Sequence, residues 1–392
     1  MTKKNLFKPS LVAMALLSTG MSTSAMAEET GFFDGSKTNF NLRYRLETVD
    51  QDGFDKNAMA STLKSRMTWK SGNVNGFQVT AEFDNVLELG PDNYNDASGV
   101  NPKTEYPVIA DPKGTDVNQL NVSYKNNGLT LIAGRQRVVV GDQRFVGGVA
   151  WRQNEQTYDG VRANYKVNDQ FTVDYAYVSK VNTIFGPDGE KDEIDGDFHL
   201  AHAFYNINKN HKITAFAHLL DFDKSEAIDT YGVDYNGKFD GFTAHAAIAT
   251  QSKGDNDVTY FAIDATKPLG KAKVTLGWER LGSDDGAYGF QTPLATKHKF
   301  QGFADKFLST PGNGIDDYYA KVATKVGGVN LAAFYHSYSA VEGDADYGSE
   351  IDLVASYKVL EATTLVAKYA NYDADEHASD TTKFWFMVNT KF

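Results

Sequence analysis

Arginine is distributed very unevenly along this chain of 392 residues. Of nine arginines, only Arg280 lies beyond residue 162. The other eight are Arg43, Arg45, Arg66, Arg135, Arg137, Arg144, Arg152 and Arg162. Guanidinium groups are always charged at neutral pH and bind carboxylates and phosphates through paired hydrogen bonds. If these side chains share one surface, they indicate electrostatic recognition of anions rather than covalent chemistry.

The residue types that catalyse reactions have no recognisable spacing. His199 and His202 are three residues apart, which places them on opposite faces of a strand, so they cannot share a metal ion. Neither HExxH nor GxSxG occurs. The adjacent aspartates at 284–285 and 316–317 diverge in extended chain, and the acidic run 188–197 lacks EF-hand spacing. The sequence therefore predicts no catalytic residues, no cofactor and no metal site.

Segments with apolar residues at every second position recur along the chain, and this period predicts β-strands. The sequence predicts 18 strands, at residues 38–49, 58–71, 77–88, 115–126, 128–139, 156–166, 170–181, 196–207, 211–222, 228–237, 240–250, 256–266, 271–281, 315–325, 328–340, 347–359, 361–372 and 381–392. Tight turns such as 126–128 and 208–210 alternate with mostly longer, acidic loops such as 182–195. This alternation predicts an up-and-down meander. An open meander would expose two edge strands, and closing it into a barrel pairs them with each other.

Charged side chains gather on one face of the first three strands, and apolar side chains on the other. On the first strand, Phe40 and Leu42 alternate with Arg43 and Arg45. A barrel of this size is too wide for its own side chains to fill. The pattern therefore predicts apolar residues toward lipid and polar residues toward a water-filled lumen. The expected fold class is all-β, a transmembrane antiparallel β-barrel of the bacterial outer membrane.

Alternation along these strands predicts a charged pore lining. Its expected members are Arg43, Arg45, Glu47, Lys64, Arg66, Lys70, Glu82, Asp84 and Arg162. A basic wall of this kind would favour anionic or polar solutes, although the arginines could instead only balance the lumenal acids. Arg135 is ambiguous, because alternation from Leu131 and Ala133 puts it on the lipid face at a cost of about 2–4 kcal/mol near the midplane. A bulge could shift the register there, or the strand could already have left the membrane.

Residues 1–27 predict a secretory signal peptide. Three lysines precede the short apolar run LVAMALL (11–17), and the following AMA supplies small residues for cleavage after Ala27. This assignment makes 28–37 a periplasmic N-terminal segment and 38–392 the barrel. The absence of cysteine excludes disulfides, and the net charge of −12 argues against a nucleic-acid partner.

Two stretches resemble the alginate export family of outer-membrane barrels. They are GRQRVVVGDQRFVGGVAWRQNEQTYDGVR (134–162) and GFQTPLATKHKFQGFADKFLSTPGNGIDD (289–317). The resemblance implies an outer-membrane pore, and the family's named member passes an anionic polysaccharide through an arginine-rich lumen. The candidate pore-lining groups that it implies here are Arg135, Arg144, Arg152 and Arg162. This chain is shorter than the polysaccharide exporter and mixes lysine and arginine with acids, and many members of the family look like general porins.

The longest predicted loop, 282–314, carries the candidates for a constriction. Phe300, Phe303 and Phe307 have helical spacing. The constriction candidates around them are Lys297, His298, Lys299, Asp305 and Lys306. A short helix could fold into or over the mouth and narrow it, or the loop could pack outside on its neighbours.

The chain ends in the alternating stretch KFWFMVNTKF. Phe384, Phe386, Val388 and Phe392 are expected to face lipid, and the last strand is expected to pair with the first. A terminal Phe resembles the signal by which outer-membrane barrels are assembled. The expected partners are therefore the barrel-assembly machinery, outer-membrane lipid with lipopolysaccharide, and small anionic or polar solutes.

The sequence as a whole predicts a porin-like channel for passive diffusion of small hydrophilic, anionic solutes, and not an enzyme. The alternative within this class is a conduit for an acidic polysaccharide such as alginate. An outer-membrane enzyme is less favoured, because no Ser/His or Asp/His constellation with recognisable spacing occurs among the loops. A surface receptor is also less favoured, because only the long acidic loops support it.

Overall fold

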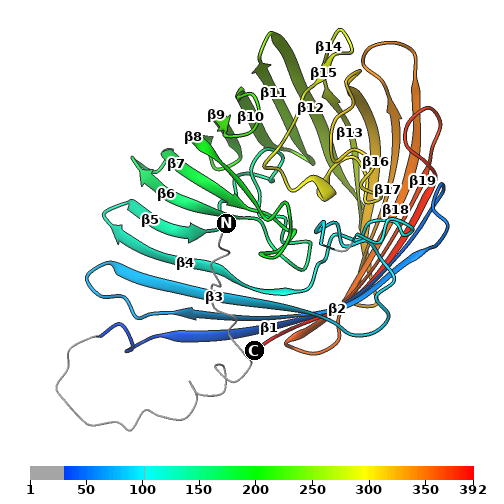
Figure 1. The fold of residues 1–392 in the computed structure, drawn as a ribbon. Helices are drawn as coiled ribbons and strands as arrows, with labels where there is room; N and C mark the ends of the chain where they lie inside the picture. The colour runs from blue at the N-terminus through cyan, green and yellow to red at the C-terminus, as the bar shows by residue number, and fades with distance from the viewer. Residues whose placement is uncertain (1–30, 101) are drawn as a thin grey trace.

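The computed structural model describes residues 31–100 and 102–392. The expected signal peptide at residues 1–27 lies outside this part of the chain. Eighteen long strands form one antiparallel sheet that closes on itself, which confirms the predicted fold class (Figure 1). Within the described residues, no helix is both long and apolar enough to cross a membrane.

The strands follow the predicted segments closely. They are β1 (Lys37–Gln51), β2 (Ala58–Lys70), β3 (Phe77–Glu88), β4 (Gly114–Asn126), β5 (Leu129–Gln136), β6 (Thr157–Lys166), β7 (Phe171–Asn182), β8 (Glu193–Asn208), β9 (His211–Phe222), β10 (Ile228–Phe239), β11 (Phe242–Lys253), β12 (Asn256–Leu269), β13 (Ala272–Leu281), β16 (Ile315–Val326), β17 (Val329–Ser339), β18 (Asp346–Lys358), β19 (Thr363–Asp373) and β20 (Thr381–Lys391). The short strands β14 (Ser283–Asp284) and β15 (Tyr288–Gly289) and the 3₁₀ turn η1 (Lys297–Lys299) lie in the longest loop.

Pairing of β1 with β20 closes the barrel. Phe384 lies opposite Thr48, and Phe386 opposite Leu46, so the apolar face of the last strand continues the outer face of β1. Beyond β20, the amide of Phe392 donates to the carbonyl oxygen of Phe40 at 2.8 Å, and the amide of Phe40 donates back at 3.1 Å. The last residue of the chain therefore completes the seam.

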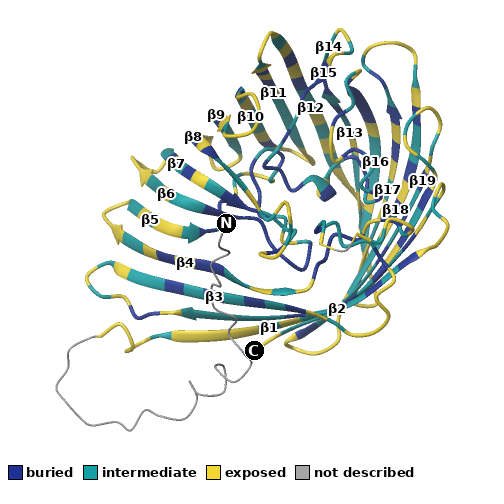
Figure 2. Cartoon of the chain, viewed as in Figure 1, coloured by how far each residue is buried: buried dark blue, intermediate teal, exposed yellow. Residues whose placement is uncertain are grey.

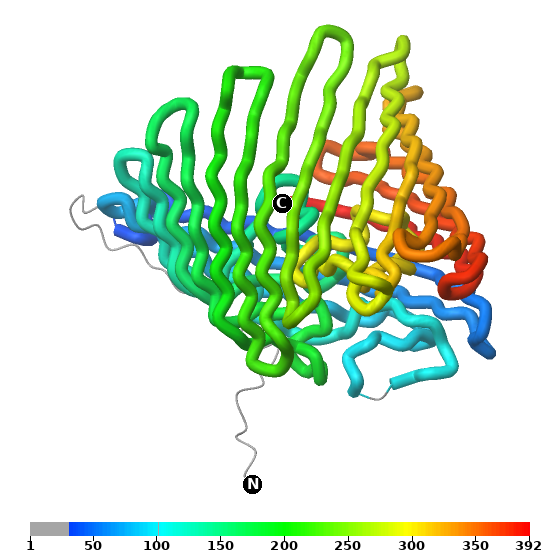
Figure 3. Tube along the Cα trace, turned by 90° about the horizontal axis from the view of Figure 1, so that it is seen from above, coloured from blue at the N-terminus to red at the C-terminus, as the bar shows by residue number. Residues whose placement is uncertain are grey.

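Successive strands run up and down beside one another in chain order (Figure 3). Tight turns join them at the end where β1 begins, and longer connections join most of them at the other end. One departure is the two-residue connection 254–255 between β11 and β12, which lies at the loop end. We call the two ends of the barrel the turn end and the loop end.

One predicted strand, 128–139, is too long. Strand β5 stops at Gln136, and the chain then turns into the lumen. There Arg137 donates from Nε to Glu155 at 2.6 Å and also bonds to Glu82. Ion pairing with lumenal acids thus redirects a segment whose alternation alone would have extended the strand.

Loops 137–156 and 282–314 fold inside the ring of strands, where much of their chain is buried (Figure 2). This arrangement decides between the two placements that the sequence left open for loop 282–314. The predicted helix in that loop is limited to η1, because Gln301, Gly302 and Asp305 have φ values of 48°, 77° and 62°. Left-handed backbone at these positions does not continue a helix.

The lumen at the loop end is not uniformly polar, contrary to the expectation from alternation. Val138, Val146 and Leu294 of the lumenal loops form a buried cluster with inward-facing residues of β6 to β10. Phe198 and Leu200 of β8 belong to this cluster and have no exposed surface. The loops fill the space that the wall side chains cannot, and they need an apolar wall to pack against.

Candidate functional site

The carboxylate of Asp305 links loops 137–156 and 282–314 to each other and to the strands of the barrel wall. It accepts hydrogen bonds from His298 Nδ1 at 2.7 Å, from Arg152 Nη2 at 3.1 Å and from Lys383 Nζ at 3.2 Å. Asp305 and His298 come from loop 282–314, Arg152 from loop 137–156 and Lys383 from β20. We call these four residues the Asp305 latch.

The protonation of the latch follows from its burial. Burial alone would raise the pKa of Asp305, but the charge of Lys383, the hydrogen bond from His298 and the charge of Arg152 hold it well below its usual range. Burial lowers the pKa of His298 to about 3, so its ring is neutral. The neutral ring donates from Nδ1 to Asp305 and accepts at Nε2 from Lys368 Nζ at 2.6 Å. The neutral ring can therefore donate to the Asp305 carboxylate and accept from Lys368 at the same time.

An aromatic cage surrounds Lys368 beside the latch. Its ammonium lies 3.2 Å from the ring centroid of Phe303, 4.0 Å from that of Trp151 and 5.3 Å from that of Trp385. Cation–π contacts of this kind are stronger where water is excluded. The cage joins the two loops to β19 and β20.

Strand β18 binds loop 282–314 through the loop's backbone. The amide of Ala304 donates to Glu350 at 2.6 Å, and the amide of Phe303 donates to Asp352 at 3.2 Å. A Cβ at Gly302 would lie 2.3 Å from the carboxyl carbon of Glu350. The close approach of the carboxylate and the φ of 77° at Gly302 together favour glycine at this position.

Of the other constriction candidates in the loop, Lys297 donates to the carbonyl of Leu308 at 2.5 Å and Lys299 to the carbonyl of Asp142 at 2.6 Å. Burial, followed by the charge of Arg144, lowers the pKa of Lys297 to about 8. Burial, followed by the charge of Lys383, lowers the pKa of Lys306 to about 8. These two lysines therefore titrate near physiological pH.

The structure brings several of the predicted arginines together on one wall of the lumen and pairs most of them with acids. We call this group the arginine wall; its members are Arg43, Arg45, Arg66, Arg137 and Arg152. Arg45 donates to Asp111 at 2.7 Å, and Arg152 donates to Glu47 at 3.0 Å. In the described part of the chain, Arg43 is the one member of the arginine wall without an ion pair to a carboxylate. It bonds instead to neutral oxygens, including the carbonyl of Ala150 at 2.9 Å.

A second group of ion pairs lies nearer the turn end. Arg66 donates to Asp84 at 2.6 Å and to Glu155 at 2.9 Å. Lys64 beside them is buried, and Lys70 lines a cavity together with Glu82. The sequence had not singled out the acids Asp111 and Glu155, because both lie in loops far from their partners along the chain.

The remaining predicted arginines lie on other parts of the barrel. Arg162 pairs with Asp174 at 3.0 Å on the inner face of β6 and β7. Arg144 is buried in the lumen, where it pairs with Glu279 at 2.5 Å. Neither belongs to the network around Arg45 and Arg66.

The assignment of Arg135 to the pore lining is wrong. Arg135 lies opposite Leu120 and Asp159 in the sheet, on the outer face, one residue before β5 ends. No bulge in β5 turns it inward. Its guanidinium pairs with Asp159 at 2.8 Å, which compensates the charge at the loop-end rim of the barrel.

Two cavities lie along the arginine wall. The upper cavity, at the loop end, has a volume of about 460 Å³, and its charged lining is Arg152, Lys297, Asp305, Lys306 and Lys383. The lower cavity, at the turn end, has a volume of about 670 Å³, and its charged lining is Arg43, Arg66, Glu82, Arg137, Glu155 and Lys391. Basic residues outnumber acids in both linings.

A thin layer separates the two cavities, which share no lining residue. Arg43, in the lower cavity, donates to the carbonyl oxygens of Trp151 and Arg152 at 3.3 and 3.2 Å, and both of these residues line the upper cavity. Arg45 stacks on Trp151 at 4.4 Å in the same layer. This layer is the candidate constriction, and loop 137–156 supplies it together with β1.

Comparison with known proteins gives a family and a fold. A family model described as alginate export matches residues 36–301. Among solved structures, OccAB4 of Acinetobacter baumannii superposes with a TM-score of 0.73 at 15% identity, covering 91% of this chain and 98% of that one. OccAB2 of the same organism gives 0.72 at 18%, covering 93% and 100%. OccK9 (OpdG) of Pseudomonas aeruginosa gives 0.71 at 15%, covering 92% and 99%. No curated protein matches the sequence.

Proposed function

Because the chain belongs to the alginate export family and forms a barrel of the bacterial outer membrane, we propose that it is a porin-like channel for passive diffusion of small hydrophilic, anionic solutes. The excess of basic over acidic residues in both cavities of the arginine wall carries this proposal. A lining with net positive charge raises the local concentration of anions. The expected partners remain the outer-membrane lipid with lipopolysaccharide, the assembly machinery and the solutes themselves. The proposal assigns no catalytic step to the chain.

Cavity size supports small solutes over polymers. The upper and lower cavities have volumes of about 460 and 670 Å³, which are in the range that single small molecules fill. A conduit for an acidic polysaccharide such as alginate is the second candidate, and the name of the matching family favours it. A polysaccharide would have to cross the layer of Arg43, Arg45 and Trp151 as an extended chain.

Reversal potentials in planar bilayers with a KCl gradient test the anion preference. Arg43→Gln removes the one arginine of the wall that, within the described residues, has no carboxylate partner, so the preference for chloride should fall. Arg135→Gln is the matched control, because it removes an arginine from the outer face and should leave the reversal potential unchanged. A cation preference in the wild type, or equal potentials in wild type and Arg43→Gln, would refute the basic-wall explanation.

Oligomers of uronate separate the two candidate functions. Added to the same bilayers, monomers and dimers should interrupt the current briefly if the pore takes small solutes. Long alginate chains should then have little effect. Sustained block by long chains at lower concentration than by dimers would favour the polysaccharide conduit instead.

A further inference from the structure

The turn end of the barrel is strongly basic. It consists of residues 31–39, residues 389–392 and the eight turns, each taken with the three strand residues on either side. These segments contain thirteen lysines, against four acidic side chains and the C-terminal carboxylate. All of the lysines except Lys212 are exposed. The turn end therefore presents a ring of positive charge to the solution.

The loop end carries the opposite charge. Its nine connections, taken with the same three strand residues on either side, contain 36 acidic residues against 16 lysines and arginines. Ion pairs remove equal numbers of both signs, so 20 acidic residues remain in excess. Asp52, Asp223 and Asp344 are exposed in three different loops of this end. The excess negative charge is thus spread along the rim and is not confined to one loop.

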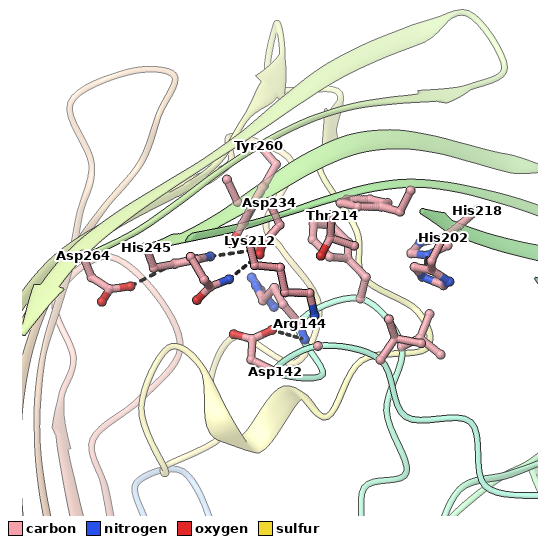
Figure 4. Close-up of a pocket in the computed structure, with 17 residues that line it drawn as sticks. Asp142, Arg144, His202, Lys212, Thr214, His218, Asp234, His245, Tyr260 and Asp264 are labelled. Atoms are coloured by element: carbon pink, nitrogen blue, oxygen red, sulfur yellow. Dashed lines mark hydrogen bonds and ion pairs between the residues drawn. The ribbon is translucent and has the colours of Figure 1, made fainter. Parts of the chain in front are cut away.

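The positive charge of the turn end is largely uncompensated and reaches into the lumen. Within the described residues, Lys166 is the one lysine of this end with an ion pair, to Asp169 at 2.7 Å. Lys70 and Lys391 line cavities beside the arginine wall. Lys212 lines a third cavity of about 530 Å³, between residues 140–146 and the inner faces of β8 to β12 (Figure 4). Ions that enter from the turn end therefore meet lysines before they reach the constriction.

Charges of this kind change the local concentrations of ions at the two mouths. The acidic loop end enriches cations and the basic turn end enriches anions. The range of this effect is the Debye length, which is about 30 Å in 0.01 M salt and about 3 Å in 1 M salt. In dilute salt the pore thus has a cation-rich mouth and an anion-rich mouth in series.

Two mouths of opposite charge in series do not conduct equally in both directions. A negative voltage on the turn-end side draws anions into the lumen from the turn end and cations from the loop end. Both ions then accumulate in the lumen, and the conductance rises. A voltage of the opposite sign draws both ions out, and the lumen is depleted.

We propose that the opposite charges of its two ends make this channel a rectifier, which passes more ionic current when the turn-end side is negative. This property goes beyond the anion preference of the arginine wall. Selectivity depends on the sum of the charges along the pathway, whereas rectification depends on their order along the barrel axis.

Current–voltage curves of single wild-type barrels in planar bilayers test the proposal, with the same KCl solution on both sides. In about 0.01 M KCl, the current with the turn-end side negative should exceed the current at the opposite voltage by about twofold or more. In about 1 M KCl, where screening is nearly complete, the ratio of the two currents should approach one. This comparison uses the wild type alone and does not depend on the folding of any variant.

The orientation of each barrel can be read from one introduced thiol, because the chain contains no cysteine. Ser225→Cys places this thiol in the exposed loop 223–227 at the loop end. Once the thiol carries biotin, streptavidin should change the current only when it is added on the side that the loop end faces.

Variants at the two ends separate rectification from selectivity. Lys267→Gln, Lys271→Gln and Lys273→Gln together remove three exposed lysines around one turn, and Glu342→Gln with Asp344→Asn removes two exposed acids from one loop. Both variants should lower the current ratio in dilute KCl. Reversal potentials in a KCl gradient should shift toward cations in the lysine variant and toward anions in the acid variant.

Lys166→Gln combined with Asp169→Asn is the matched control, because it removes an ion pair and leaves the net charge of the turn end unchanged. It should rectify as the wild type does. A linear curve of the wild type in dilute KCl, the opposite polarity, a ratio that persists in 1 M KCl or unchanged ratios in both end variants would each overturn the proposal. Each of these results leaves the anion preference standing, because a reversal potential is measured at zero net current.

Discussion

Removing the charge of Asp305 should release the lumenal loops. Asp305→Asn keeps the shape of the side chain but leaves Lys383 and Arg152 without its charge, and both are buried. Breaking one partner of a buried ion pair costs about 3–5 kcal/mol. The lower value applies here, because Arg152 keeps its ion pair with Glu47. A cost of about 3 kcal/mol raises the ratio of undocked to docked loop by about a hundredfold.

Single-channel recording and limited trypsin digestion measure the undocked fraction. In Asp305→Asn, mean conductance and current noise should rise, and trypsin should cut loop 282–314 at Lys297 and Lys306 faster. Asp285→Asn is the matched control, since Asp285 is exposed in the same loop and its φ of 48° is one that asparagine tolerates. Wild-type conductance together with wild-type cleavage in Asp305→Asn would refute the latch.

Three further predictions concern the loops and the seam. First, Lys297 and Lys306, with pKa values near 8, are charged below that pH and neutral above it, so anion preference should fall between pH 7 and pH 9. Reversal potentials should show the fall, and replacing both lysines by Met should abolish it; an unchanged pH response would contradict this origin. Second, Gly302→Ala should undock the loop, whereas Gly343→Ala, at φ +85° with nothing within 4 Å, carries only the backbone strain of about 1–2 kcal/mol. Equal proteolysis of the two variants would exclude the steric contact. Third, deletion of Phe392 should lower the yield of assembled barrel in membranes more than the conductance of the barrels that do assemble, and normal yields would argue against its role.

The strands could be predicted because their signal is local. Each needs only its own alternation, and the tight turns mark where one strand ends and the next begins. The inner and outer faces of β1 to β3 also followed, since all of their charges except Asp50 lie on one side. The same rule fails on β8, where Phe198 and Leu200 face inward and His199 faces outward. Loops covering the inner wall make both faces apolar, which removes the contrast that alternation depends on.

The site could be predicted only in part, because its contacts join distant segments. Arg43 meets Ala150 across 107 residues, and Arg144 meets Glu279 across 135. Arg135 has the same residue type and lies in the same part of the sequence, yet only its register shows that it points outward. His202 was compared with His199, its neighbour in sequence, although its partner in space is His218. Composition identified the basic wall but not the acids that neutralise it.

The number of arginines therefore overstates the field in the pore. Ion pairs to Asp111, Glu47, Asp84 and Glu155 consume most of the wall's charge. Two of them, Arg152 with Glu47 and Arg66 with Glu155, also hold loop 137–156 in place. Apolar packing against β6 to β10 also holds the same loop. Selectivity must then come from the charges left over, among which Arg43 stands at the layer between the cavities. A single substitution there should change ion preference more than loss of any paired arginine, which would chiefly loosen the loop.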